Sequence, residues 1–368
     1  MSFFVLLKFI AGLLFLITGA ELLVRGSSRM AQLLGISPLI VGLTIVAFGT
    51  SSPELAVSVF ASLKGAPDLA VGNVVGSNIF NILFILGISA TIRPLMISIQ
   101  LIRIDVPLMV FVSLFVYLFG LNGRISQLEA AILFTGLIGY LVFLFAQSKK
   151  EEVSDRNIFS DANRYSVRKS MIQWLKNIVY VLIGLILLIL GSQFLINSAT
   201  LFAQKLGVSE LIIGLTMVAA GTSLPEVATS VMASIKGEQD IAVGNIVGSN
   251  IFNILAVLGL SGLVSPAGIL VSPAALRFDM PVMLAVSVAC LPVFFTDGKI
   301  SRWEGMLFFG YYLAYMIYLI LQSTHHDAAP FYSSIFLMFI LPITFITLMV
   351  LSWQAVKRKR TKDKRKKE

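Results

Sequence analysis

The sequence predicts an all-α multi-pass membrane protein made of two inverted-topology five-helix repeats and one extra C-terminal transmembrane helix. Composition is the first observation behind this prediction, because 57% of the 368 residues are hydrophobic and only 13% are charged. A soluble domain does not have this balance, and several apolar runs reach the roughly 20 residues that a bilayer-spanning helix requires. An internal duplication and the number of predicted spans are the other two observations.

The chain contains two pairs of nearly identical segments, and the members of each pair are 172 positions apart. Residues 42–54 (GLTIVAFGTSSPE) and 214–226 (GLTMVAAGTSLPE) share ten of thirteen residues. Residues 70–83 (AVGNVVGSNIFNIL) and 242–255 (AVGNIVGSNIFNIL) differ at one position of fourteen. Every copy places polar side chains inside apolar sequence. A duplicated polar patch within the membrane is typical of the ion site of a secondary transporter.

Hydropathy divides the chain into eleven predicted spans, at residues 3–23, 37–62, 69–90, 104–121, 127–147, 174–197, 209–235, 241–263, 279–295, 303–322 and 331–353. The chain is then organised as a first five-helix repeat (1–147, motif pair 42–83), a cytosolic linker (148–173), a second five-helix repeat (174–322, motif pair 214–255), the extra transmembrane helix (331–353) and a basic cytosolic tail (354–368). Since five is an odd number, the second repeat must enter the membrane with the opposite polarity, which predicts an inverted repeat.

The distribution of Lys and Arg predicts the orientation in the membrane. With the N-terminus outside, 23 of the 28 Lys and Arg residues lie on the inner side, which is the positive-inside pattern. We therefore expect a protein of the inner or plasma membrane with a cytosolic C-terminus. Topology and contact of the tail with anionic lipid explain the net charge of +9, so nucleic-acid binding is not expected. We expect the monomer to be functional.

A proline within each first motif predicts a break in the helix that carries it. Pro53 and Pro225 lack the N–H that would bond to the carbonyls of Gly49 and Gly221, four residues earlier. Unwound backbone is tolerated inside a bilayer only where it is buried in protein or lines a cavity. The carbonyls freed at such a break are hard oxygen ligands for a cation.

Glu54 and Glu226 are the central candidates for cation binding. A charged residue at the middle of a bilayer costs roughly 2.5–3.5 kcal/mol, and neither motif contains a Lys or Arg as a partner. The remaining partner is a mobile cation, and Ca²⁺ suits this set because it takes about 6–8 oxygen ligands. Zn²⁺ and Cu⁺ would require His or Cys. A glutamate beside a proline is also compatible with a structural cap, but duplication of the whole polar set favours ligands.

The second motif adds hydroxyl and amide groups on one helix face. Ser77 and Asn81 are four residues apart, as are Ser249 and Asn253, so each pair projects from one side of its helix. The same segments contain Asn73, Asn78, Asn245 and Asn250. Other polar residues are expected to be structural: Asp68, Asp105, Asp240 and Asp279 as helix caps, Glu21 and Arg25 as an interfacial ion pair, and Cys290 as a small core residue.

The combination GTSSPE with GSNIFN, repeated as GTSLPE with GSNIFN, resembles the paired alpha repeats of the calcium/cation antiporter superfamily. The motifs are most similar to those of the prokaryotic type of the sodium/calcium exchanger branch, which lacks a regulatory loop. The resemblance covers about residues 1–322. The resemblance implies alternating access, with Na⁺ moving inward and Ca²⁺ outward through one shared site, no cofactor, and sliding first and sixth spans. Matched by position, it implies the cation ligands Ala47, Thr50, Ser51, Glu54, Ser77, Asn81, Ala219, Thr222, Ser223, Glu226, Ser249 and Asn253.

Potassium coupling is not expected, because potassium-dependent relatives carry Asp where this chain has Asn253. A Ca²⁺/H⁺ antiporter that uses the same carboxylates is the nearest alternative, since protons compete for clustered carboxylates. Inverted repeats around broken helices disfavour a passive channel. An intramembrane hydrolase with Ser51 or Ser52 as nucleophile would need a base, and neither of the two His residues lies in a predicted span. We therefore do not expect an enzyme.

Overall fold

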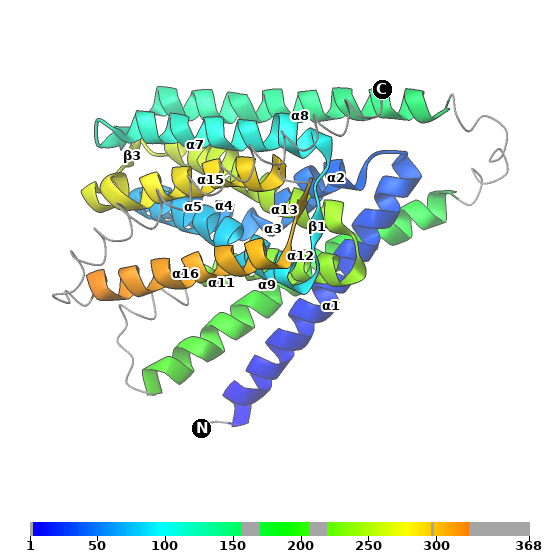
Figure 1. Ribbon diagram of the computed structural model, residues 1–368. Coiled ribbons are helices and arrows are strands. Elements are labelled where there is room, and N and C mark those ends of the chain that lie inside the picture. The colour runs from blue at the N-terminus through cyan, green and yellow to red at the C-terminus, as the bar shows by residue number, and fades with distance from the viewer. Residues whose placement is uncertain (1–2, 157–169, 206–218, 296–297, 324–368) are drawn as a thin grey trace.

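The computed structural model describes residues 3–156, 170–205, 219–295 and 298–323, and these residues are nearly all helical (Figure 1). The first half contains α1 (Phe3–Leu34), α2 (Pro38–Val41), η1 (Gly42–Val46), α3 (Ala47–Thr50), α4 (Ser52–Leu63), α5 (Asp68–Phe80), η2 (Asn81–Leu86), α6 (Gly87–Ile92), β1 (Leu95–Met96), η3 (Leu101–Asp105), α7 (Val106–Gly120), β2 (Arg124–Ile125) and α8 (Gln127–Arg156). The second half contains α9 (Ser170–Lys205), α11 (Ala219–Thr222), α12 (Leu224–Lys236), α13 (Gln239–Phe252), η6 (Asn253–Leu258), α14 (Gly259–Val264), β3 (Ile269–Leu270), η7 (Ala275–Asp279), α15 (Met280–Phe295), β4 (Lys299–Ile300) and α16 (Arg302–Ser323). The η segments are π-helical stretches within longer helices.

The described residues contain eight helices long and apolar enough to cross a membrane, and one bent pair supplies a ninth span. These agree with nine of the eleven predicted spans. The seventh, 209–235, is described only from Ala219 onward, and the eleventh, 331–353, lies outside the described residues together with the basic tail. Helix α8 continues to Arg156, and helix α9 begins at Ser170. Both helices therefore extend into the predicted linker 148–173.

The second span is broken at the position that the sequence predicts. Helix α3 ends at Thr50, α4 begins at Ser52, and the two parts of the span are bent by 45°. Ser51 lies between them with φ −79° and ψ 2°. Pro53 lies in the first turn of α4, where its missing N–H leaves no intrahelical bond unmade. The break therefore places Glu54 in the first turn of a new helix.

Two short strand pairs show that the repeats are inverted. β1 pairs antiparallel with β4, and β2 pairs antiparallel with β3. In the first repeat β1 precedes the span of α7 and β2 follows it, whereas in the second repeat β3 precedes the span of α15 and β4 follows it. The start of the span that contains α7 therefore lies beside the end of the span that contains α15, and the reverse also holds. The two repeats run through the bundle in opposite directions, as predicted.

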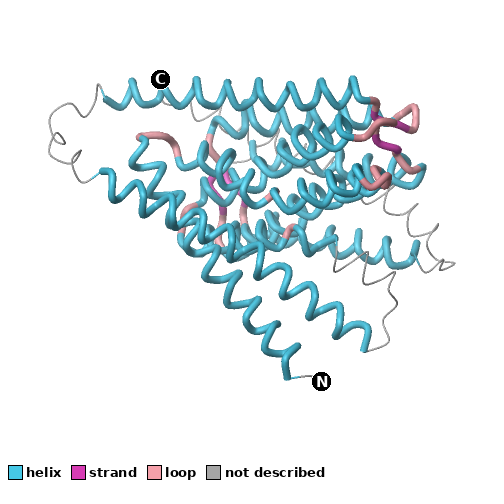
Figure 2. The backbone as a smooth tube through the Cα atoms, turned by 180° about the vertical axis from the view of Figure 1, so that it is seen from behind, coloured by secondary structure: helices cyan, strands magenta, loops and turns pink. Residues whose placement is uncertain are grey.

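The helices that carry the second motifs form the centre of the bundle. The most apolar 18-residue stretch of Gln239–Val264 is wholly buried, and 72% of the corresponding stretch of Asp68–Ile92 is buried. Helices α7, α8, α15 and α16 pack around this pair and contribute to the same apolar core. Figure 2 shows from behind that helices make up almost all of the described chain, with the strands as short segments between them. Helices α1 and α9 lie side by side at the edge and are inclined to the other helices (Figure 1).

Helices α1 and α9 approach each other closely through glycines. A Cβ atom at Gly12 would lie 3.0 Å from the carbonyl oxygen of Gly191, and one at Gly19 would lie 2.9 Å from that of Gly184. Such distances leave no room for a side chain between the two backbones, which is the small-residue packing expected of membrane helices. The pair is therefore held by close backbone contact.

Two aspartates that the sequence predicts as helix caps have another role. The Oδ1 atom of Asp105 accepts a hydrogen bond from the Tyr140 hydroxyl at 3.0 Å, and that of Asp279 accepts one from the Tyr315 hydroxyl at 2.9 Å. Asp105 stands at the N-cap position of α7, but its side chain makes no capping bond within the described residues. These aspartates join the fourth and fifth spans of each repeat.

Glu21 also differs from its prediction, because it forms its ion pair with Lys236 and not with Arg25. The Lys236 Nζ atom lies 2.8 Å from Glu21 Oε1. Nearby, the Ser28 hydroxyl donates to Glu238 Oε1 at 2.7 Å. The two contacts join α1 to the end of α12 and to the turn that follows it.

Lys64 and Lys299 test the inverted topology, because Lys64 precedes the third span and Lys299 pairs with the strand that follows that span. Both residues are exposed. Cysteines placed at these positions in a Cys290→Ala background are expected to react with an impermeant thiol reagent from opposite sides of the membrane. Labelling of both cysteines from one side would contradict the inversion.

Candidate cation-binding site

Four helices bring the polar residues of the motifs together inside the bundle. Helices α4 and α12 carry Glu54 and Glu226 in their first turns, while α5 and α13 carry the serines and asparagines of the second motifs. Glu54 is 0% exposed and Glu226 is 1% exposed. Both carboxylates are therefore inside the protein, where a charge requires compensation by polar groups or by an ion.

Each glutamate accepts a hydrogen bond from a serine of the other repeat. The Ser51 hydroxyl donates to Glu226 Oε1 at 3.1 Å, and the Ser223 hydroxyl donates to Glu54 Oε1 at 2.9 Å. Ser51 and Ser223 are the residues at the two helix breaks. The same contact thus occurs twice, once in each direction, and the two repeats share one site.

An asparagine joins a threonine to a serine on each side of the site. The Thr50 hydroxyl donates to Asn245 Oδ1 at 3.0 Å, and Asn245 Nδ2 donates to the Ser230 hydroxyl oxygen at 2.9 Å. The equivalent contacts are 3.5 and 3.0 Å long and involve Thr222, Asn73 and Ser58. Since a hydroxyl has one proton, a threonine that donates to the amide keeps its lone pairs as acceptors for a cation.

Four buried side-chain oxygens of the site have no hydrogen-bond partner among the residues that the structure describes. They are Oε2 of Glu54, Oε2 of Glu226, Oδ1 of Asn81 and Oδ1 of Asn253. Buried polar atoms in native proteins are almost always paired, so such a group calls for a ligand. All four atoms are acceptors, two from each repeat. Carboxylate and amide oxygens are the ligands that Ca²⁺ and other hard cations prefer.

The backbone carbonyls at the helix breaks are less available than the sequence suggests. The carbonyl oxygen of Gly49 accepts from the Ser52 hydroxyl at 2.6 Å, and that of Gly221 accepts from the Ser192 hydroxyl at 2.6 Å. Hydroxyl groups therefore satisfy the carbonyls that the prolines free. In this conformation the available oxygens of the site are mainly those of side chains.

The remaining predicted ligands lie around this centre. The Ser77 hydroxyl lies 3.1 Å from that of Ser223, and the Ser249 hydroxyl lies 3.5 Å from that of Thr50. The Ala47 carbonyl accepts from a backbone N–H at 2.9 Å and is a second, more distant acceptor for the Thr50 hydroxyl proton at 3.3 Å. Ala219 is the first residue of α11, and its side chain lies outside the described set.

Sequence reasoning missed the contacts of three residues at this site. Asn78 and Asn250 contact the amides of Asn253 and Asn81, and only their duplication within GSNIFN indicated a role. Ser192 had no such signal, because the equivalent position of the first repeat is Ala20. Its contact with Gly221 depends on how α9 packs against α11, which a local pattern does not reveal.

The ligand types of the site suit a hard cation. Across the described ranges, no group of three or more His, Cys, Asp or Glu residues gathers to hold a metal ion. Softer metals such as Zn²⁺ and Cu⁺ prefer His and Cys. The site instead combines two carboxylates with neutral hydroxyl and amide oxygens, which are ligands that hard cations prefer.

Two inverted repeats whose broken helices enclose a cluster of buried carboxylate, hydroxyl and amide oxygens are the architecture of a secondary transporter of cations. The sequence profile described as "Sodium/calcium exchanger protein" matches residues 4–146 and 176–321, which correspond to the two repeats. The chain therefore belongs to the sodium/calcium exchanger family. It is a membrane transporter of the cation exchanger class and not an enzyme.

Relatives match most of the chain. The putative antiporter CaxA of Alkalimonas amylolytica is 40% identical over 317 residues, covering 85% of this chain and 98% of CaxA. The inner membrane protein YrbG of Escherichia coli is 40% identical over 284 residues, covering 76% and 85%. The sodium/calcium exchanger MaX1 of Methanosarcina acetivorans is 35% identical over 338 residues, covering 84% and 96%.

A solved structure supports the same fold. The sodium-calcium exchanger NCX_Mj, soaked with 2.5 mM Na⁺ and 1 mM Sr²⁺, superimposes on this chain with a TM-score of 0.74 at 29% identity. The alignment covers 86% of this chain and 99% of that one. The all-helical multi-pass fold with two repeat halves is thereby confirmed.

Glu54→Gln and Glu226→Gln are each expected to weaken Ca²⁺ binding by at least about 100-fold, because two unit charges 4 Å apart are worth about 4 kcal/mol at an effective dielectric constant of 20. Equilibrium binding of ⁴⁵Ca²⁺ to the purified protein measures this loss. Glu129→Gln is the matched control, since Glu129 caps α8 by accepting from the Ser126 backbone N–H at 2.7 Å. Wild-type affinity in either site variant would refute the assignment.

Proposed function

We propose that this protein is a secondary active antiporter that exchanges Na⁺ for Ca²⁺ by alternating access and exports Ca²⁺. The set of four buried oxygens without a described partner carries the proposal, because both repeats contribute equally to it. The proposed ligands are backbone or side-chain oxygens of Ala47, Thr50, Ser51, Glu54, Ser77, Asn81, Ala219, Thr222, Ser223, Glu226, Ser249 and Asn253.

The charge of the site supports exchange of these two ions. The two carboxylates of Glu54 and Glu226 neutralise one Ca²⁺ or two Na⁺, and a neutral site is far cheaper to enclose in a low-dielectric interior than a charged one. Because both ions use the same oxygens, one must leave before the other binds. MaX1, a relative that bears the name sodium/calcium exchanger, supports Na⁺ as the counter-ion.

Buried hydroxyl groups extend from the site toward both ends of the bundle. Ser58 and Ser62 continue the polar face of α4 beyond Glu54, and Ser230 and Ser234 continue that of α12 beyond Glu226. These four serines are at most 2% exposed. Since the repeats are inverted, the two rows run toward opposite ends. We infer that each row is an ion route to one membrane face.

Helices α1 and α9 are the proposed moving pair. Only 22% of the most apolar 18-residue stretch of α1 and 33% of that of α9 are buried inside the protein. Lipid therefore surrounds most of the surface of both helices. Both contact the broken helices, since α1 packs on α12 and α9 packs on α3, α11 and α12. The hydrogen bond from Ser192 of α9 to the Gly221 carbonyl links the pair directly to one break. A displacement of these helices would therefore reach the site without crossing the core.

We propose that the end of the bundle with β1 and β4 faces the cytosol and that the N-terminus is outside. Lys299 lies in β4, and Arg93 lies just before β1. A Cβ atom at Gly237 would lie 2.6 Å from the Arg93 guanidinium, so Lys236 belongs to the same end. Positive charges gather on the cytosolic side of membrane proteins. The name of YrbG, an inner membrane protein, supports the same membrane for this chain.

Proteoliposomes loaded with Na⁺ are expected to accumulate ⁴⁵Ca²⁺ until the Na⁺ gradient is dissipated. An equal pH gradient without Na⁺ should drive little uptake, because hydroxyl and amide oxygens contribute to Na⁺ binding and do not hold a proton. Ca²⁺ uptake driven by the pH gradient alone would instead identify a Ca²⁺/H⁺ antiporter that uses the same carboxylates. Protein carrying both Glu54→Gln and Glu226→Gln provides the inactive control.

Exchange is expected to be independent of K⁺. Positions 81 and 253 carry neutral asparagines, so Glu54 and Glu226 are the only charges of the motif pairs at the site. Two carboxylates balance one Ca²⁺ and leave no charge for a further cation. Na⁺-driven Ca²⁺ flux should therefore stay unchanged when choline replaces K⁺ on both sides at clamped voltage. A strict K⁺ requirement would show that charge at these positions does not decide the coupling ion.

A further inference from the structure

Two asparagines lie behind the amides of Asn81 and Asn253 and orient them. Asn81 Nδ2 donates to Asn250 Oδ1 at 3.2 Å, and Asn253 Nδ2 donates to Asn78 Oδ1 at 3.1 Å. Both hydrogen bonds cross from one repeat to the other. All four asparagines are at most 1% exposed, so water does not compete for these contacts.

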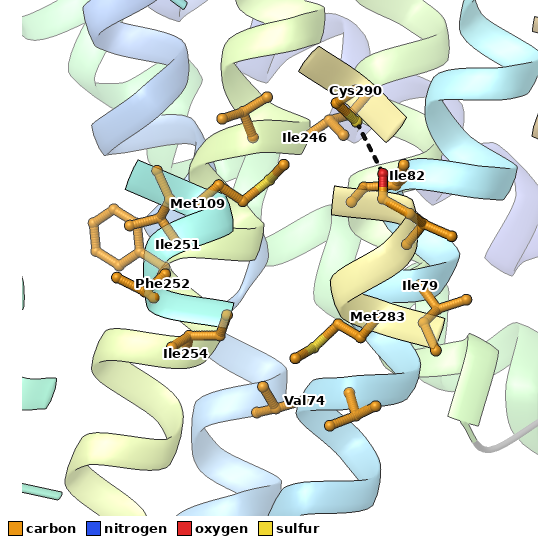
Figure 3. Close-up of a cluster of buried hydrophobic side chains, with 14 of the residues drawn as sticks. Val74, Ile79, Ile82, Met109, Ile246, Ile251, Phe252, Ile254, Met283 and Cys290 are labelled. Carbon is orange, nitrogen blue, oxygen red and sulfur yellow. Dashed lines mark hydrogen bonds between the residues drawn. The ribbon is translucent and has the colours of Figure 1, made fainter. Parts of the chain in front are cut away.

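The two outer asparagines are themselves held in one orientation. Asn250 Nδ2 donates to the Met109 sulfur at 3.5 Å. Asn78 Nδ2 donates to the backbone carbonyl of Asn250 at 3.2 Å and lies 3.8 Å from the Met283 sulfur. Both methionines belong to the cluster of buried apolar side chains (Figure 3). Because their N–H groups donate to these acceptors, Asn78 and Asn250 present their oxygens to the amide N–H groups of Asn253 and Asn81.

Orientation matters because the two ends of an amide have similar shapes and opposite polarity. An Asn81 side chain turned by half a rotation would point N–H groups at a bound cation and repel it. In the structure the Nδ2 atoms of Asn81 and Asn253 face the outer asparagines. Their Oδ1 atoms are left without a partner within the described part of the chain. The outer contacts thus select the attractive end of each amide.

We propose that Asn78 and Asn250 are positioning residues that hold the amide oxygens of Asn253 and Asn81 on the transported cation. This inference rests on the proposed function. Each ligand amide takes its orientation from the opposite repeat, as each glutamate takes its hydrogen bond. Asn78 and Asn250 do not touch the ion in this arrangement and act only through their partners.

The methionine sulfurs suit this task because sulfur is a weak acceptor. A sulfur atom gives the buried N–H of Asn250 a partner, but it is a poor ligand for a hard cation. A carboxylate or carbonyl at Met109 would also accept the N–H, and it would offer the ion a competing position. Asn78 and Asn250, held by the methionine sulfurs, therefore orient the amides of Asn253 and Asn81 without placing another hard oxygen ligand beside the site.

A double-mutant cycle between Asn250 and Asn81 tests the proposal. Equilibrium ⁴⁵Ca²⁺ binding is measured on purified wild-type protein, Asn250→Leu, Asn81→Ala and the double variant, each checked for a monodisperse size-exclusion profile. Asn250→Leu is expected to raise the Kd about 10- to 100-fold, the usual effect of losing a partner that orients a metal ligand. The double variant should match Asn81→Ala alone, because Asn250 has nothing left to orient. Fully additive effects would overturn the inference and leave a packing role.

An equivalent cycle with Asn78→Leu and Asn253→Ala gives the same decision if Asn250→Leu does not fold. Ser113→Ala is the matched control, because the buried Ser113 hydroxyl contacts that of Ser287 at 3.5 Å and does not reach the site. Its Kd for Ca²⁺ should equal that of the wild type. Wild-type protein that binds no Ca²⁺ at millimolar concentration would overturn the proposed function together with this inference. Normal wild-type binding with additive cycles would overturn the inference alone.

Discussion

Two hydrogen bonds between the repeats, from Ser51 to Glu226 and from Ser223 to Glu54, are the contacts on which the rest of the structure depends. A carboxylate buried in a membrane protein must be compensated, and here each half supplies the donor for the carboxylate of the other. Neither repeat completes the site alone. Inversion is what makes the contacts reciprocal, because it brings the break of one repeat against the glutamate of its counterpart.

Irregular backbone and polar contacts reinforce each other around these bonds. The break before Pro53 starts a new helix, so Glu54 lies near the positive end of a helix dipole, which favours a negative charge. The π-helical stretches η2 and η6 begin at Asn81 and Asn253, and such stretches are frequent at functional sites. The irregular segments cost backbone stability, and the cross-repeat hydrogen bonds and the close packing of α13 on η1 offset that cost.

The fold and the position of much of the candidate site could be predicted because the polar motif residues were copied together with the helices. A proline and a glutamate that recur at one offset identify the break and the charge it carries. The contacts of Asp105 with Tyr140 and of Ser192 with Gly221 could not be predicted. Periodicity reveals which helix face is polar, but not which helix it meets. Neutral hydrogen bonds differ in net energy by only about 1 kcal/mol, so tertiary packing selects among them.

The ion pair between Glu21 and Lys236 breaks the symmetry between the halves. The equivalent positions hold Gln193 and Lys64, and a neutral glutamine cannot form the same pair. A transporter built from two identical inverted halves would be degenerate, because a two-fold axis in the membrane plane would exchange its two conformations and give them equal energy. A partly exposed ion pair at one end lifts that degeneracy slightly. In the proposed transport cycle, an asymmetry of this kind favours one of the two conformations by at most about 1 kcal/mol, and the ion gradients supply that free energy in one direction of the cycle.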